Sequence, residues 1–263
     1  MNSKLKTILS GSILSLSNWK GESFESVTFL SGTDYYSNSI KGIRQHIFTG
    51  KSELGYSFIH DSIWSKQNDI LNLQYLVKIQ RKNVSHSVNA FLNTQLLTSF
   101  KYEKDVNQEY RRQRVGTFMN PAAMEFGYGM NILFWQQSTL NISIASARLR
   151  VSPITTSTAR PKQDVVGKVN KGWLLFDYGL SGQLIVIKKF SKEVEWNSSG
   201  KMFLKGFSKD EVQFDISNTM SYQFWKYLEM RADLKLVYDP LISFRLQHRN
   251  ELQFGFVYKL ENK

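Results

Sequence analysis

Apolar and polar residues alternate along much of this chain. The final stretch, RNELQFGFVYKLENK, carries an apolar side chain at every second position from Leu252 to Leu260. Gln253 and Gly255 lie between those positions. A period of two residues predicts a β-strand, and no comparable stretch of the chain shows the 3.6-residue period of a helix.

The same alternation predicts about twelve strands of roughly 10 to 18 residues each. Soluble strands are usually about 5–6 residues long. A tilted transmembrane strand needs about 9–11 residues within lipid, so these lengths favour a membrane barrel. The clearest strands are expected at 71–79, 88–96, 124–134, 174–186, 212–224, 228–236 and 244–258, and fainter ones at 5–19, 26–36, 44–58, 140–151 and 200–207.

The connections between predicted strands alternate between short and long. Residues 82–86, 136–139 and 225–226 make short turns, whereas 101–121 and 152–171 make long loops. Short turns on one side and long loops on the other are typical of outer-membrane barrels. An even number of strands then places both chain ends on the periplasmic side.

The fold class predicted is all-β, a transmembrane antiparallel up-and-down β-barrel that forms one domain over residues 1–263. Only helices and closed barrels satisfy every backbone polar group in hydrocarbon, and no run of 18 apolar residues is present to form a helix. The apolar face would contact lipid and the polar face the lumen. Aromatic residues at predicted strand ends suit the two interfaces: Tyr75, Tyr128, Trp135, Trp173, Phe224, Trp225, Tyr238 and Tyr258.

Charge and composition narrow the possible partners. The chain has no cysteine, which removes disulfides, thiolate catalysis and cysteine-ligated metals. The net charge of +12 could suit nucleic acid, but the basic residues do not gather on one predicted helix, so no nucleic acid is expected. The densest basic cluster, Arg111, Arg112 and Arg114, is placed in the loop 101–121. This cluster is either a solvated loop or a contact for lipopolysaccharide phosphate.

The first nineteen residues contain two lysines and a weakly apolar stretch interrupted by serines and a glycine. This segment is interpreted as a first strand rather than a signal peptide, because no small-residue cleavage site stands out. On this interpretation the secretion signal that an outer-membrane protein needs is not in this numbering.

The histidines give little sign of catalysis. His46, His60, His86 and His248 are scattered, without metal-ligand spacing or a carboxylate cluster. HSVN at 86–89 is the nearest candidate for an active site, and it is placed in a short periplasmic turn. No catalytic residue, metal or cofactor is therefore predicted.

Charges of both signs share the lumenal face of the last predicted hairpin. The turn at 238–243 is expected to pair Tyr238 with Phe244, which sets Asp233 opposite Arg249 and Arg231 opposite Glu251. Opposed charges are tolerable inside a barrel, whereas unpaired ones cost several kcal/mol. The network either fills a narrow lumen or lines it as a selectivity element for a small solute. Its members are Glu229, Arg231, Asp233, Lys235, Arg245, Arg249 and Glu251.

The end of the chain also resembles the β-signal that the bacterial barrel-assembly machinery reads. The matching residues are Gln253, Gly255, Tyr258 and Leu260. They lie at the end of the last alternating strand, where such a signal is expected.

Five stretches together resemble a family of Gram-negative outer-membrane barrels of unknown function. The chain departs from that pattern at WKGES, where a glycine pair usually follows the tryptophan, and region 191–207 is shorter. The resemblance implies a barrel and carries no known activity. The stretches are SLSNW at 15–19, FMNPAAMEFGYGMNILF at 118–134, VSPIT at 151–155, LVYDP at 236–240 and NELQFGFVYKL at 250–260.

The sequence therefore predicts an integral outer-membrane protein of a Gram-negative bacterium that is not an enzyme. Its role would be structural, or that of a narrow channel, or that of an accessory subunit in an outer-membrane assembly. Outer-membrane lipid, lipopolysaccharide, the barrel-assembly machinery and other outer-membrane proteins are the expected partners. Two alternatives stay open: a barrel enzyme that acts on lipid or lipopolysaccharide, and a soluble β-barrel binding protein.

Overall fold

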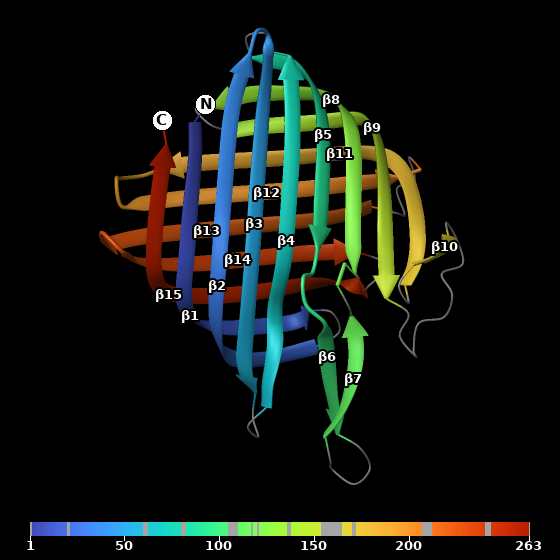
Figure 1. Ribbon diagram of the computed structural model, residues 1–263, viewed down its shortest axis with the longest axis vertical. Coiled ribbons are helices and arrows are strands. Elements are labelled where there is room, and N and C mark those ends of the chain that lie inside the picture. The colour runs from blue at the N-terminus through green and yellow to red at the C-terminus, as the bar shows by residue number, and fades with distance from the viewer. Residues whose placement is uncertain are drawn as a thin grey trace.

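The strands of the protein close into one antiparallel β-barrel (Figure 1). The computed structural model describes residues 2–19, 22–59, 63–79, 83–104, 110–116, 118–119, 121–135, 138–153, 165–169, 172–206, 212–239 and 243–262. Within these residues no helix is long and apolar enough to cross a membrane.

In the described part of the chain, twelve strands of 11 to 20 residues form the barrel. They are β1 (Asn2–Trp19), β2 (Glu22–Lys41), β3 (Arg44–Ile59), β4 (Ile63–Ile79), β5 (Val84–Thr94), β8 (Ala122–Trp135), β9 (Ser138–Pro153), β11 (Gly172–Lys189), β12 (Val194–Lys205), β13 (Val212–Trp225), β14 (Leu228–Asp239) and β15 (Ser243–Asn262). Each pairs with its neighbours in this order, including β9 with β11, and the pairing of β1 with β15 closes the ring. The predicted twelve-stranded up-and-down barrel is thus confirmed.

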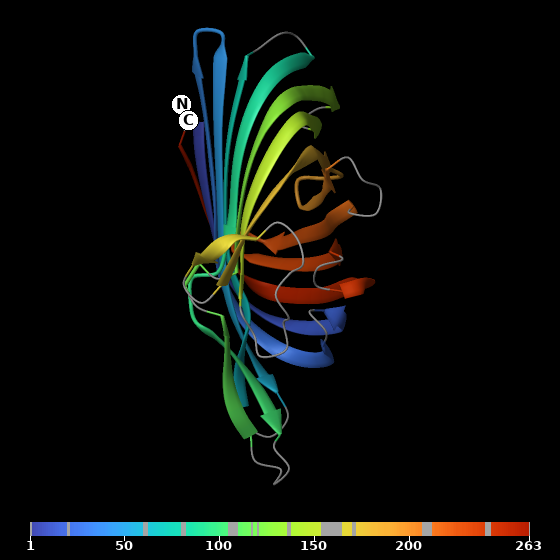
Figure 2. The same ribbon diagram turned by 90° about the vertical axis from the view of Figure 1, so that its right-hand side faces the viewer.

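Both chain ends lie at the same end of the barrel, as an even number of strands requires (Figures 1 and 2). We call this the terminus end and the opposite one the loop end. A two-residue turn at Gly42 and Ile43 joins β2 to β3 at the terminus end. Gly42 has a φ of +59°, a backbone conformation that glycine adopts without a steric penalty.

The connection predicted at 101–121 is not a simple loop. β6 (Ser99–Lys104) and β7 (Tyr110–Gly116) form a separate antiparallel hairpin there. This hairpin projects beyond the barrel at the loop end (Figures 1 and 2). Arg111, Arg112 and Arg114 therefore lie on a strand, so their placement in a loop was wrong. Their side chains are outside the described residues.

Smaller differences concern element ends. β10 (Val165–Val169) pairs with β11 inside the segment 152–171, which was predicted to be a loop. The turn predicted at 225–226 lies at 226–227, one residue further along. β12 begins at Val194, six residues before the predicted start, because WNSSGK has no apolar alternation and yet pairs on both sides.

The barrel has an apolar outer face and a polar inner face. On β15, Gln247, Gln253 and Val257 are buried, while Phe254 and Phe256 are 53% and 63% exposed. Residues with odd numbers on this strand therefore point into the lumen and those with even numbers point outward. This is the reverse of a soluble protein, whose apolar side chains fill the interior.

Candidate functional site

The lumen holds most of the buried polar side chains, and its two sides differ in composition. The strands β14, β15, β1 and β3 carry large charged side chains inward, and we call them the charged wall. The strands β5, β8, β9 and β11 carry many glycines, serines and asparagines inward, and we call them the small-residue wall. The buried inward residues of the small-residue wall include Ser85, Ser87, Asn131, Asn141, Ser143 and Ser146.

On the charged wall, several ion pairs form within single strands. Arg231 Nε lies 2.7 Å from Asp233 Oδ2, and Arg249 pairs with Glu251. Residues two apart on a strand point to the same face, so each strand supplies its own counter-charge. Ser12 on the neighbouring β1 also donates a hydrogen bond to Glu251 Oε1 at 2.7 Å.

A carboxylate from β3 ties these pairs together. Glu53 is 9% exposed and forms a 2.6 Å ion pair with Lys51. Arg231 and Arg249 also attract it electrostatically. The middle of the lumen is therefore crossed by a network in which both signs of charge are represented.

The predicted register of the last hairpin was wrong by two residues over most of its length. Asp233 faces Glu251, Arg231 faces Gln253, and Lys235 faces Arg249. The two predicted pairs, Asp233 with Arg249 and Arg231 with Glu251, are therefore not directly opposite each other across the two strands.

The reason for this shift lies close to the turn. Asp239 pairs with Ser243 in the predicted register, but an irregularity follows between Val237 and Asp239. Val237 pairs with Gln247, so β15 advances four residues while β14 advances two. Since each charge already has a partner on its own strand, opposed charges did not have to fix the register.

The remaining predicted members of the network lie in several places. Glu229 is buried at the terminus end, 2.7 Å from Lys6 Nζ and 3.7 Å from Lys259 Nζ. Lys235 pairs with Asp215 on β13 at 3.0 Å. Arg245 is on β15, and its side chain is outside the described residues.

The small-residue wall is built around glycines that larger residues could not replace. A Cβ on Gly129 would lie 1.9 Å from the carbonyl oxygen of Ile142, and one on Gly179 would lie 2.0 Å from that of Leu204. The register of β9 shifts beside both glycines, and Ile144 and Ala145 are exposed in succession there. Glycine is thus needed where a neighbouring backbone comes this close, from β9 at Gly129 and from β12 at Gly179.

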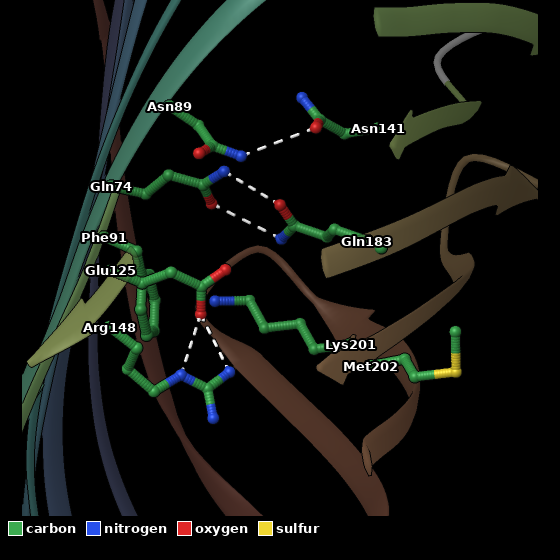
Figure 3. Close-up of a pocket in the computed structure, with 10 residues that line it drawn as sticks. Gln74, Asn89, Phe91, Glu125, Asn141, Arg148, Gln183, Lys201 and Met202 are labelled. Atoms are coloured by element: carbon green, nitrogen blue, oxygen red, sulfur yellow. Dashed lines mark hydrogen bonds and ion pairs between the residues drawn. The ribbon is translucent and has the colours of Figure 1, made fainter. Parts of the chain in front are cut away.

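Small side chains on β5, β8 and β9 leave room for contact between the strands on either side of them. Gln74 on β4 donates to Gln183 Oε1 on β11 at 2.9 Å. Asn89 and Asn141 meet nearby at 3.4 Å (Figure 3). Neutral amides therefore join β4 to β11 and β5 to β9 at this height of the barrel.

A small cavity of about 20 Å³ lies beside these amides. Glu125 and Arg148 point into it from one side and Lys201 from the other (Figure 3). Its lining residues are Gln74, Asn89, Phe91, Glu125, Asn141, Arg148, Gly182, Gln183, Lys201 and Met202.

Arg148 is the most highly connected side chain of this region. It donates to Glu125 Oε2 through Nε at 3.2 Å and through Nη2 at 2.9 Å, and to Gln213 Oε1 at 2.5 Å. Its guanidinium carbon lies 3.8 Å from the centroid of the buried Phe203 ring. Sequence reasoning missed this site, although Arg148 and Lys201 occupy polar positions within or beside predicted strands.

A second missed cluster surrounds Asp177 at the loop end of β11. This carboxylate is 1% exposed and is shared by Arg150 on β9 and Lys205 on β12, the latter at 3.2 Å. The alternation did place Asp177 on the polar face of its strand. It could not show that two basic residues from other strands converge on it.

The proposed assembly signal lies at the seam where the barrel closes. Gln253 is buried and Gly255 pairs with Ser10 of β1. Tyr258 and Leu260 are 55% and 50% exposed on the outer face, opposite Thr7 and Leu5. A Cβ on Gly255 would lie 2.4 Å from that of Ser10, so the closing strands approach closely.

The described histidines are not grouped. His46 Nδ1 lies 2.7 Å from Tyr75 Oη, and His86 Nδ1 lies 3.5 Å from Tyr128 Oη, both on exposed surface. HSVN belongs to β5 rather than to a turn, and His86 and Asn89 point to opposite faces. His60 is outside the described residues. Among the residues that the structure covers, no three His, Cys, Asp or Glu side chains are placed to hold a metal.

Comparison with known proteins gave matches to solved structures only. An outer-membrane channel from Pseudomonas putida F1 is 10% identical with a TM-score of 0.46, and the match covers 98% of this chain and 96% of that one. The NanC porin is 8% identical with a TM-score of 0.43, over 94% and 98% of the two chains. The translocator domain of the autotransporter NalP from Neisseria meningitidis is 12% identical with a TM-score of 0.38, over 98% and 87%.

These likenesses are too remote to transfer an activity, a solute or a partner. No protein-family model matches the chain, and no curated protein matches it. The family resemblance drawn from the five sequence stretches has no support from these comparisons.

Proposed function

We propose that the protein is an integral outer-membrane β-barrel with a lumen filled by its own side chains, and that its role is structural or accessory rather than enzymatic. The inverted distribution of side chains carries this proposal. Large apolar residues cover the outside, including Phe29, Phe126 and Tyr178 at 57%, 52% and 62% exposure. Water would make such a surface costly, whereas hydrocarbon solvates it.

The filling of the lumen supports a structural role. Ion pairs cross the charged wall, amides join β4 to β11, and Arg148 reaches from β9 to Gln213 on β13. Removing one partner of a buried ion pair leaves an uncompensated charge and strongly destabilises the fold, so the pairs are expected to stay closed. Such a lumen stiffens the barrel and opposes free diffusion of solutes.

A narrow channel is the second candidate, and one observation favours it. The contact between Gln74 and Gln183 involves neutral side chains, which separate at a lower cost than a buried ion pair. In a channel that opens, the contact between Gln74 and Gln183 would therefore be the first to break. Conductance across a planar bilayer separates the two roles, since a structural barrel gives none.

Lipid and lipopolysaccharide are the partners that the outer surface suits. At the terminus end, Lys188 Nζ lies 5.3 Å from the Trp135 ring centroid and 4.8 Å from that of Phe190. Aromatic and basic residues together suit a membrane interface, where rings meet headgroups and ammonium groups meet phosphate. The basic residues of β7 extend this expectation to lipopolysaccharide at the loop end.

The last strand is proposed to engage the barrel-assembly machinery. β15 must both present the assembly signal and close the barrel against β1, from Ser3–Asn262 to Ser17–His248. Deletion of residues 254–263 should therefore abolish insertion into the outer membrane. The heat-modifiable band of the folded protein should be absent from outer-membrane fractions, and a normal amount of it would refute this role.

Single-cysteine labelling tests the membrane proposal directly, because the natural chain has no cysteine. Spin labels at Leu234 and Phe254 should be reached by oxygen dissolved in lipid, since both residues are exposed on the outer face. Labels at Asp233 and Gln253, the adjacent inward positions, should not. Access of aqueous reagents to Leu234 and Phe254 but not to Asp233 and Gln253 would make the barrel a soluble one.

A further inference from the structure

Lys201 differs from the other lumenal cations described above in having no bonded counter-charge. Among the described residues, its ammonium group has no hydrogen-bond acceptor within bonding distance, although it points into the cavity beside Glu125 (Figure 3). It lies 2.9 Å from the centroid of the Phe91 ring. Burial strips water from it, and Glu125 and Asp215 attract it, whereas Arg148 and Lys235 repel it.

Both of these carboxylates are already engaged. Glu125 accepts two hydrogen bonds from Arg148, and Asp215 forms a 3.0 Å ion pair with Lys235. Glu125 thus serves two cations, Arg148 and Lys201, so this pocket holds one positive charge more than its carboxylate balances. An ammonium that has lost water without gaining an acceptor is costly, and a bound anion removes that cost.

The space available limits the anion to a small one. The cavity of about 20 Å³ is close to the room that one water molecule needs. The side-chain amides of Gln74 and Gln183 each use one N–H in their mutual contact, which leaves a second N–H on each that can donate to an anion. A phosphate or an organic carboxylate would have to break the contact between Gln74 and Gln183 to fit.

We propose that the cavity beside Lys201 binds one small inorganic monoanion, of about the size of chloride. The anion would lie between the Lys201 ammonium and the amide groups, with the Phe91 ring behind the lysine. This site would neutralise the excess charge of the pocket and hold the amide contact closed. The proposal rests on the proposed barrel only in requiring a folded lumen, which is present in detergent as well as in membrane.

Chloride-35 NMR of the folded protein in detergent tests this proposal. The chloride line should broaden in the presence of protein, and added bromide should compete while gluconate, which is too large, should not. Lys201→Met should weaken chloride binding by about ten- to hundredfold, as expected when a charged hydrogen-bond donor is lost. Lys6→Met is the matched control. Lys6 does not line the cavity, and Glu229 keeps Lys259 as a counter-charge when Lys6 is replaced.

A second variant keeps the test informative if Lys201→Met folds poorly. Glu125→Gln removes the competing negative charge and should tighten chloride binding. Equal line broadening by the parent protein and by Lys201→Met would overturn the site, and so would an unchanged affinity in Glu125→Gln. Folding is followed separately by heat-modifiable migration, and membrane placement by the spin labels, so failure of the barrel proposal is distinguishable from failure of this one.

Discussion

The charged wall and the small-residue wall close the same lumen by different means. On the charged wall, long side chains reach inward and find partners on their own or neighbouring strands, as Arg231 does with Asp233. On the small-residue wall, short side chains on β5, β8 and β9 let Gln74 of β4 reach Gln183 of β11. Four strand steps of about 4.8 Å separate β4 from β11 along that wall, so it must curve for the contact to form.

This difference shows which part of the structure depends on charge and which on backbone shape. On the charged wall, the pairs of Arg231 with Asp233 and of Arg249 with Glu251 do not depend on the register, because both members of each pair lie on one strand. The small-residue wall tolerates no shift of register beside Gly129 and Gly179, because the strands there approach within backbone contact. The lumen is therefore electrostatically satisfied on one side and sterically determined on the other.

The largest effect is expected from breaking an ion pair of the charged wall. Arg249→Met leaves the buried Glu251 carboxylate with Ser12 but without its cation, and should lower the free energy of unfolding by about 3–5 kcal/mol. The double variant Arg249→Met with Glu251→Gln should recover much of that loss. Urea unfolding followed by tryptophan fluorescence measures both. A double variant no more stable than the single one would contradict a mainly electrostatic wall.

A smaller effect is expected from enlarging a residue on the small-residue wall. Gly129→Ala forces the β8 and β9 backbones apart and should lower the free energy of unfolding by about 1–3 kcal/mol. Gly200→Ala is the control, since a Cβ there meets nothing within 4 Å. It should leave the stability unchanged or slightly higher. Equal losses in the two variants would mean that the close approach at Gly129 does not constrain the fold.

The sequence predicted the faces of the strands better than it predicted the contacts inside the lumen. Alternation alone assigned Asp233 and Gln253 to the polar side and Leu234 and Phe254 to the apolar side. It could not pair Gln74 with Gln183, which are 109 residues apart. That contact depends on the stagger and tilt of the whole barrel, which no single strand encodes.

The register error and the missed hairpin have similar physical causes. Opposed charges were expected to set the pairing of β14 with β15, but each had a nearer partner two residues along its own strand. The β6–β7 hairpin escaped notice because its strands of 6 and 7 residues are too short to show alternation clearly. Local pattern is thus a good guide to long strands with an apolar outer face and a poor one to short or fully polar pairings.

The smallest effect is expected from a double-mutant cycle on Gln74 and Gln183. This cycle compares a contact across the lumen with one between adjacent strands. Each single change to leucine leaves the other amide without its partner, so each should cost about 0.5–1.5 kcal/mol. The double change should cost less than the sum of the two single changes, and the difference is a coupling energy of about the size of one single cost.

Asn72 and Asn93 form the control pair, because they hydrogen-bond at 2.7 Å between adjacent strands in an exposed position. Their coupling should be near zero, since water replaces a lost partner there. A coupling between Gln74 and Gln183 no larger than that of the control would show that β4 and β11 do not meet, and that the lumen stays open at this height.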